Sequence, residues 1–432
     1  MLKNMPKSAF SAIKNSLRAL LGGADVSLVE LEKGKATPSP ENQREIVAGI
    51  EVDGVRYFFR AQRKELAFTP MEIKFIGELL TALAGLMAGF SAKGFEGHFR
   101  TALLTSLTDI AVARYIRGDR KGVFWPTQSL VQLLKNLSYQ RYESAPATTG
   151  FLVYRAQLDD FLKTLRKTRY DWFDLEENRR RINSSFFKNP VPYRFVDGYR
   201  ALFVCDIRMN LKGIIRTSSP GPKDYIDQLS NRETLSLLEN AGDDSFALFV
   251  NKTSEVEIVL QNDKLLLWRK GYWGIFDPSI MREQLKGKLE KRSIDHLIWS
   301  MYALSKIRHG TVVLVADDEI NLDAIRMGSV GGRDPLSRAL IHHVRGKKIG
   351  ALKRSGELSR ILTSDGLTII NRKGELVDTG VIIDTSKVGD LVTGGGRTTA
   401  ATAASILGPV IKVSEDGQVS LFHKGRQTYH FG

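Results

Sequence analysis

Residues 311–315 read Thr-Val-Val-Leu-Val, an uninterrupted run of β-branched and apolar residues. Such a run is typical of a strand that is buried on both faces by helices. Apolar residues at helical spacing precede it: Ile294, Leu297, Ile298 and Met301. A strand of this kind directly after an amphipathic helix predicts an α/β domain, which we place at residues 291–432.

More strands are predicted downstream. Four apolar runs are bounded by turn residues, at 367–370, 376–383, 410–413 and 419–422. Asp334-Pro335 predicts a helix start, because aspartate caps helices and proline is favoured in their first turn. We therefore expect a mixed β-sheet flanked by helices.

The middle of the chain reads as β-structure. Residues 246–250, 256–260 and 264–268 are strand-like, and Asn262-Asp263 predicts the turn between the last two. These runs predict a small β-rich domain at 196–290, a probable sensor or linker. The aromatic cluster of Tyr272, Trp273 and Phe276 could bind a ligand or simply pack the sheet.

The first part of the chain begins with a hairpin signal and continues with helical spacing. Residues 46–59 contain two apolar runs around Asp53-Gly54. Three helical faces follow: Leu103, Leu107, Ile110 and Ala113; Leu130, Leu133, Leu134 and Leu137; Leu158, Phe161, Leu162 and Leu165. We expect a mostly helical N-terminal domain of unknown role at 1–195.

The charge is unusual for a chain of 432 residues, since 63 Lys and Arg face 48 Asp and Glu, a net +15. That balance favours an anionic partner, such as nucleic acid, an anionic membrane surface or nucleotide phosphates. The basic stretch 163–181 interleaves cations with aromatic rings, which suits a phosphate backbone with stacked bases. Four carboxylates in the same window favour a solvated surface instead.

Cys205 is the only cysteine, so no internal disulfide can form, and it lies in an apolar run that predicts a buried strand. The longest uncharged apolar stretch, 79–92, is shorter than the roughly 20 residues that cross a bilayer and predicts a buried helix. No signal peptide is predicted, although a basic amphipathic surface helix at the N-terminus stays open. We expect a cytoplasmic protein.

Two loops in the last domain have residues suited to phosphates or a metal. Asp365-Gly366 precedes a strand, where the carboxylate could hold a divalent cation or accept a proton, or merely make a turn. Gly394, Gly395 and Gly396 run into Arg397, Thr398 and Thr399 at a helix start. Glycines let backbone N–H groups approach an anion and the arginine can bind phosphate oxygens, although a flexible turn is the alternative.

A third loop, Ser414-Glu415-Asp416-Gly417, predicts a hairpin turn with adjacent carboxylates, which could meet a metal or only form the turn. Two other candidates are weaker. His342 and His343 are neighbours on a helix and point about 100° apart, which does not suit one metal ion. Asp317-Asp318-Glu319 is best interpreted as an acidic loop.

The order of these motifs resembles the diadenylate cyclase domain. Its pattern corresponds here to Arg308-His309-Gly310 before a strand, Asp365-Gly366-Leu367, Gly374-Glu375-Leu376, Arg397-Thr398-Thr399 and Ser414-Glu415. The resemblance implies that two protomers meet face to face, each with one ATP and Mg²⁺ or Mn²⁺, and condense two ATP into cyclic di-AMP and pyrophosphate. Such domains are often attached to probable sensor segments, so the N-terminal regions would regulate this one.

The resemblance also implies roles for residues. Asp365, Gly366 and Arg397 would be catalytic; Asp365 and Glu415 would hold the metal. The nucleotide would meet Leu367, Gly394, Gly395, Gly396, Arg397, Thr398, Thr399, Ser414 and Glu415. The chain departs from the family at Leu367 (alanine), Thr398 (histidine), Thr399 (arginine) and Ile406 (glutamate). A nucleotide-binding protein without turnover is therefore an alternative, and a basic nucleic-acid-binding protein is a second one, although no nucleic-acid motif accompanies the charge.

Overall fold

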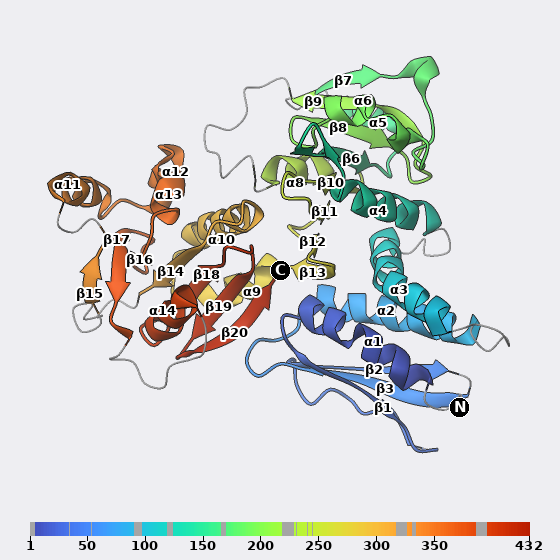
Figure 1. Ribbon diagram of the computed structural model, residues 1–432, viewed down its shortest axis with the longest axis horizontal. Coiled ribbons are helices and arrows are strands. Elements are labelled where there is room, and N and C mark those ends of the chain that lie inside the picture. The colour runs from blue at the N-terminus through green and yellow to red at the C-terminus, as the bar shows by residue number, and fades with distance from the viewer. Residues whose placement is uncertain are drawn as a thin grey trace. The chain divides into compact units, whose positions relative to one another are not determined.

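The computed structural model describes residues 5–33, 35–52, 54–89, 97–118, 124–165, 170–217, 229, 231–239, 241–243, 245–316, 326–330, 334–385 and 395–432. The chain forms two compact units, drawn in Figure 1. The first unit contains residues 1–221 and 233–277, and the second contains 222–232 and 278–432.

The first unit begins with a helix and a three-stranded antiparallel sheet. Helix α1 (Met5–Leu20) precedes β1 (Asp25–Glu30), β2 (Glu45–Val52) and β3 (Val55–Gln62), which pair in the order β1-β3-β2. Gly54, at φ +73°, lies in the tight turn between β2 and β3, as the hairpin signal predicts. Helices α2 (Pro70–Gly89), α3 (Gly97–Arg117) and α4 (Trp125–Ser138) follow.

The rest of the first unit is built on a mixed sheet with the strand order β13-β12-β11-β10-β6-β8-β9-β7. Its strands are β6 (Thr149–Val153), β7 (Tyr170–Asp174), β8 (Ala201–Cys205), β9 (Leu211–Thr217), β10 (Phe246–Val250), β11 (Val256–Val259), β12 (Leu265–Arg269) and β13 (Tyr272–Phe276). Short elements lie between them: β4 (Arg141–Tyr142), β5 (Ala145–Pro146), α5 (Leu158–Leu165), α6 (Val191–Phe195) and α8 (Arg232–Glu239).

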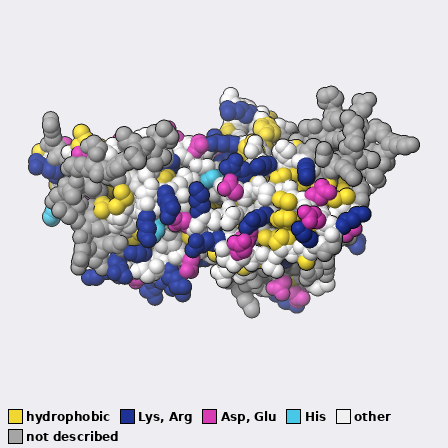
Figure 2. All heavy atoms as spheres, turned by 90° about the horizontal axis from the view of Figure 1, so that it is seen from below, with side chains coloured by type: hydrophobic (Ala, Val, Ile, Leu, Met, Phe, Trp, Pro, Cys, Tyr) yellow, Lys and Arg dark blue, Asp and Glu magenta, His cyan; other side chains and the backbone are white. Residues whose placement is uncertain are grey.

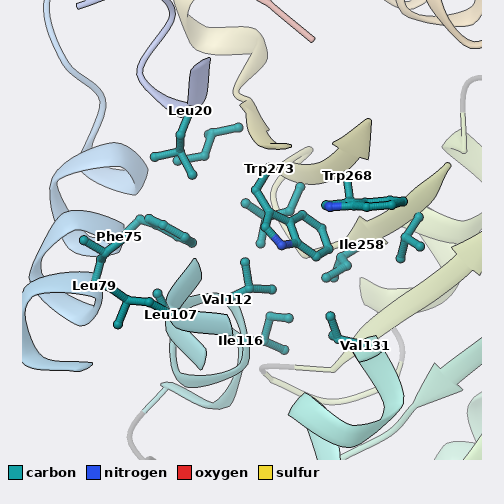
Figure 3. Packing of buried hydrophobic residues seen from close by; sticks show 14 of the residues in the cluster. Leu20, Phe75, Leu79, Leu107, Val112, Ile116, Val131, Ile258, Trp268 and Trp273 are labelled. Atoms are coloured by element: carbon teal, nitrogen blue, oxygen red, sulfur yellow. The ribbon is translucent and has the colours of Figure 1, made fainter. Parts of the chain in front are cut away.

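One hydrophobic core joins the helices of the first unit to this sheet. Figure 3 shows Phe75 of α2 and Val112 of α3 on the helical side and Trp268 and Trp273 on the strand side. The indole Nε1 of Trp273 donates to Asp109 Oδ1 at 2.8 Å, so this polar atom is satisfied inside the core. Trp273 and Phe276 of β13 therefore pack the sheet, one of the two possibilities left open by the sequence, whereas Tyr272 is exposed.

The predicted mostly helical character of residues 1–195 is wrong. Helical spacing correctly identified α3, α4 and α5, but strands β1 to β7 also lie in this region. Strand β6 is five residues long and buried on both faces, so it shows no alternation of polar and apolar residues. It pairs with β8 on one side and β10 on the other. Strands on either side of residue 195 thus share one sheet. The division of the chain at residues 195 and 290 stays a prediction.

Cys205 ends β8 and is completely buried, as its apolar context predicts. Burial raises the pKa of its thiol well above the ordinary range. We expect a thiol reagent such as 5,5′-dithiobis(2-nitrobenzoate) to label the native protein only as fast as the unit opens, and denaturant to accelerate labelling sharply. Stoichiometric labelling within seconds in native buffer would contradict this burial.

Among the described residues, no helix is both long and apolar enough to cross a bilayer. The stretch predicted as a buried helix lies in α2 as far as Gly89, and Leu79, Leu83 and Met87 are buried there. The apolar face of α1 is also covered by protein, since Phe10, whose ring packs against Phe59, lies in the core.

The second unit has a mixed sheet in the order β15-β17-β16-β14-β18-β19-β20. Its strands are β14 (Thr311–Val315), β15 (Arg326–Ser329), β16 (Leu367–Ile370), β17 (Leu376–Ile383), β18 (Val410–Val413), β19 (Val419–His423) and β20 (Arg426–Phe431). The run that predicts a doubly buried strand is β14, at the centre of this sheet. It pairs in parallel with β16 and antiparallel with β18.

Helices cover both faces of that sheet, which confirms the predicted α/β arrangement of this part (Figure 1). Helix α14 (Gly396–Ala404) packs on β14 and β18 through its buried alanines. The others are α9 (Pro278–Leu285), α10 (Lys291–Lys306), α11 (Pro335–Val344), α12 (Ile349–Arg354) and α13 (Glu357–Leu362). Asp334 caps α11 as predicted, since its carboxylate accepts from Ser337 N.

Candidate functional site

Strand directions bring three of the predicted motifs to one end of the second sheet. Because β14 and β16 are parallel, with Val312 opposite Leu367, the residues before both strands lie side by side. Strand β18 runs the other way, with Val413 opposite Thr311, so the residues after it reach the same end. His309 Nε2 donates to Thr363 O at 2.9 Å and ties the first two segments together.

Helix α14 adds the fourth motif. Gly395 is its N-cap, and small side chains let the helix approach the sheet closely, since Ala401, Ala403 and Ala404 are buried. The backbone N–H groups of Gly396 and Arg397 have no acceptor among the described residues, as expected of a first turn. Gly394 lies outside the described residues.

Arg397 is the centre of the site. Its Nη1 donates to Glu415 Oε1 at 2.6 Å, and its Nη2 lies 4.0 Å from Asp365 Oδ1. The side chain of Arg397 is 40% exposed, whereas those of Asp365 and Glu415 are 77% and 76% exposed. A guanidinium that faces solvent between two carboxylates can exchange one of them for a phosphate oxygen.

Gly310 makes room for this arginine. A Cβ added to Gly310 would lie 2.6 Å from Arg397 Nη1 and 2.8 Å from Arg397 Cζ. The guanidinium therefore lies over the backbone at the start of β14, in a place that a larger residue would fill. The absence of a side chain at Gly310 helps to define the position of Arg397.

Asp365 and Gly366 form a tight turn into β16. Gly366 has φ +91°, and a Cβ there would lie 2.6 Å from the carbonyl carbon of Gly380. The Asp365 carboxylate accepts from Gly366 N at 3.0 Å and otherwise projects into solvent. Leu367 behaves differently, because its side chain is buried in the core, and only its backbone is near the loop.

The two threonines make different contacts. Thr398 Oγ1 accepts from Lys412 Nζ at 2.7 Å, whereas Thr399 Oγ1 donates to Gly395 O at 3.5 Å. Lys412 is 8% exposed, and burial lowers its pKa. The sequence did not identify Lys412, although a lysine within the apolar strand sequence Val-Ile-Lys-Val was a usable signal.

Ser414 is engaged in its own turn. Its Oγ contacts the Asp416 carboxylate and also lies 3.1 Å from Gln418 O, while Gly417 N donates to Ser414 O at 2.8 Å. These contacts hold the hairpin between β18 and β19 in shape. The turn leaves Glu415 exposed and facing Arg397, so Glu415 is the member of this motif that is positioned to meet a ligand.

A cavity of about 360 Å³ opens beside Asp365. Its walls are mainly apolar, from α11, α13 and the segment after β15, with a few hydroxyl and charged groups. Those residues are Val330, Ser337, Leu340, Ile341, Val344, Arg360, Ile361, Ser364, Asp365, Thr379 and Gly380. A mainly apolar cavity with a few polar groups suits a flat ring system, and Asp365, which lines it, lies 4.0 Å from Arg397.

The donor set can also be tested against a divalent cation. Asp365 and Glu415 offer exposed carboxylate oxygens from two neighbouring loops. Magnesium is usually held by one or two carboxylates together with substrate phosphates, so these residues fit that chemistry. The described residues contain no group of three or more metal-ligating side chains that would hold an ion without a ligand's help.

The weaker sequence candidates gain no support as metal sites. His342 and His343 lie on α11, and His343 Nε2 is 3.9 Å from a Glu357 carboxylate oxygen and 2.8 Å from Lys347 Nζ. Asp317, Asp318 and Glu319 lie outside the described residues.

The comparisons with known proteins add no assignment. No family model matches the chain, and no curated protein matches it either.

Proposed function

We propose that the second unit is a nucleotidyltransferase domain of the diadenylate cyclase type. The observation that carries this proposal is the position of Arg397, held between Asp365 and Glu415 at one end of the sheet, beside an apolar cavity. The motifs that suggested the resemblance are dispersed over more than 100 residues, yet three charged members lie together. If these motifs were only turns, there would be no reason for their charged side chains to lie together.

In this proposal each part of the site binds a different part of ATP or its metal ion. The adenine ring would occupy the cavity lined by Leu340 and Ile361. Arg397 and the first-turn N–H groups of α14 would bind the triphosphate, since positive partial charge gathers at a helix N-terminus. A divalent cation, when bound by Asp365 and Glu415, would neutralise charge on the phosphates.

The reaction would be an in-line phosphoryl transfer. The 3′-hydroxyl of one ATP attacks the α-phosphorus of the other, a P–O bond forms, and the bond to pyrophosphate breaks; a second, identical transfer closes the ring. In this proposal Asp365 would accept the hydroxyl proton. The protein's contribution is positioning and charge stabilisation, without a covalent enzyme intermediate.

Such a reaction needs two copies of the domain facing each other. Exposed apolar side chains lie on α11, which lines the cavity, and on edge strand β15: Leu336 and Leu340 are 67% and 59% exposed, and Met327 is 76% exposed. Apolar surface of this kind is typical of an interface. We therefore include a homo-oligomer in the proposal, with the first unit regulating how the copies pair.

The test is incubation of the purified protein with ATP and Mg²⁺ or Mn²⁺, followed by chromatography with mass detection. We expect cyclic di-AMP and pyrophosphate from the parent protein, and a loss of at least about 100-fold in Asp365→Asn. Glu283→Gln is a matched control, because Glu283 is an exposed carboxylate on α9 that pairs with the equally exposed Lys286. Equal product from Asp365→Asn and the parent would refute the role of Asp365.

A binding protein without turnover is the second candidate. Thr398 and Thr399 carry no charge where the resemblance expects a histidine and an arginine, which favours binding over catalysis. ATP binding without any product would support this second function.

Nucleic-acid binding is less favoured. In the basic stretch, Lys163 pairs with Asp160 and Arg179 with Asp174, while 166–169 lie outside the described residues. Figure 2 shows lysine and arginine side chains interspersed with carboxylates on the described part of the face drawn. A continuous basic groove would be expected of a backbone-binding surface.

A further inference from the structure

Lys412 occupies an unusual place in β18. Along this strand the side chains alternate between faces, so Val410 and Lys412 share the face that α14 covers. Val410 lies in the core there, and Lys412 is 8% exposed. The ammonium group therefore ends beneath the first turn of α14, where it contacts Thr398.

This ammonium is poorly satisfied by the protein. It has three N–H donors, and Thr398 Oγ1 is its one hydrogen-bond acceptor among the described residues. Its Nζ also lies 5.9 Å from the centroid of the Phe422 ring. Burial of a charge with so few partners costs stability.

The surrounding charges act on that cost in opposite directions. Burial lowers the pKa of Lys412, Asp416 opposes this shift, and the nearby guanidinium of Arg397 adds to it. The positive end of the α14 dipole lies at the same turn. Lysine, arginine and helix N-terminus thus repel one another, an arrangement that an incoming anion would stabilise.

We propose that Lys412 is a positioning residue for the triphosphate, and that it acts through Thr398. Because Thr398 Oγ1 accepts from the ammonium, its own O–H remains available to donate toward solvent, where a phosphate oxygen would lie. A hydrogen bond that a cation polarises is strengthened. Lys412 would thereby supply, from β18, the positive charge that Thr398 and Thr399 lack. This inference rests on the proposed function, since it presumes a triphosphate at α14.

The experiment measures ATP binding by calorimetry and thermal stability for the parent, Lys412→Met and Lys412→Arg. We expect Lys412→Met to weaken ATP binding about tenfold or more, because a charge-assisted contact is lost. Its melting temperature should be equal to or above that of the parent, since methionine removes the buried charge. Lys412→Arg should recover part of the affinity. Lys353→Met is the matched control, because Lys353 is a similarly buried lysine on α12.

Three results would overturn the proposal. The first is a Lys412→Met variant that binds ATP as tightly as the parent. The second is a loss of stability and affinity together in Lys412→Met without recovery in Lys412→Arg, as a purely structural residue would give. A parent protein that binds no ATP would refute Lys412 and the proposed function together. ATP binding that depends on Lys412 without formation of cyclic di-AMP would refute the cyclase alone.

Discussion

Arg397→Ala is expected to lower the rate of cyclic di-AMP formation by about 10²–10³, the usual loss when one preorganised donor to a developing charge is removed. The guanidinium is the group that contacts both carboxylates of the site and faces solvent, so its loss removes the main cation for the phosphates. Product formation at saturating ATP measures this effect. The fold should persist, because the side chain is partly exposed and lies outside the core.

Gly310→Ala is the companion variant, since it leaves every charged residue in place. The added Cβ would push against the tip of Arg397, a flexible group that can move, and no strained backbone angle is involved. We expect an intermediate loss of rate with an unchanged melting temperature. Full activity in both variants would show that Arg397 does not act on the substrate.

Gly366→Ala should have the largest effect on stability. At φ +91° an alanine is strained, and its Cβ would lie 2.6–3.0 Å from three backbone atoms of Gly380, which cannot move aside as a side-chain tip can. We expect a loss on the order of 3 kcal/mol in the unfolding of the second unit. Scanning calorimetry would measure it.

Gly328→Ala is the control for this prediction. Gly328 belongs to β15 of the same unit, and a Cβ there meets nothing within 4 Å. The thermal unfolding transition of Gly328→Ala should therefore remain close to that of the parent. An equal loss of stability in both variants would mean that the backbone conformation of Gly366 is not what makes its substitution costly.

The second sheet was predictable because its central strands are rich in apolar residues and are bounded by turn residues. The predicted bounds of β14, β16, β17 and β18 match the structure, since these strands are short, buried and bounded by turns. Edge strand β15 was missed, because its sequence Arg-Met-Gly-Ser has neither alternation nor an apolar run. The first unit shows the same limit: its helices have a period to detect, whereas strand β6 has none.

The site was only partly predictable, for a related reason. Loop motifs identify residues that project from turns, and Asp365, Arg397 and Glu415 do project toward one another. They do not reveal which side chains turn inward, so Leu367 lies in the core and Ser414 within its own hairpin. Lys412 was overlooked because a lysine in a strand usually faces solvent.

The ion pair between Arg397 and Glu415 has a thermodynamic consequence. An anion that takes the Nη1 donor of Arg397 displaces the Glu415 carboxylate, and a released carboxylate is free to bind a cation. Anion and cation affinities are then linked, each raising the other by the same factor. In the absence of ligand the pair closes on itself, so the site would reject a lone phosphate or a lone metal ion more strongly than the two together.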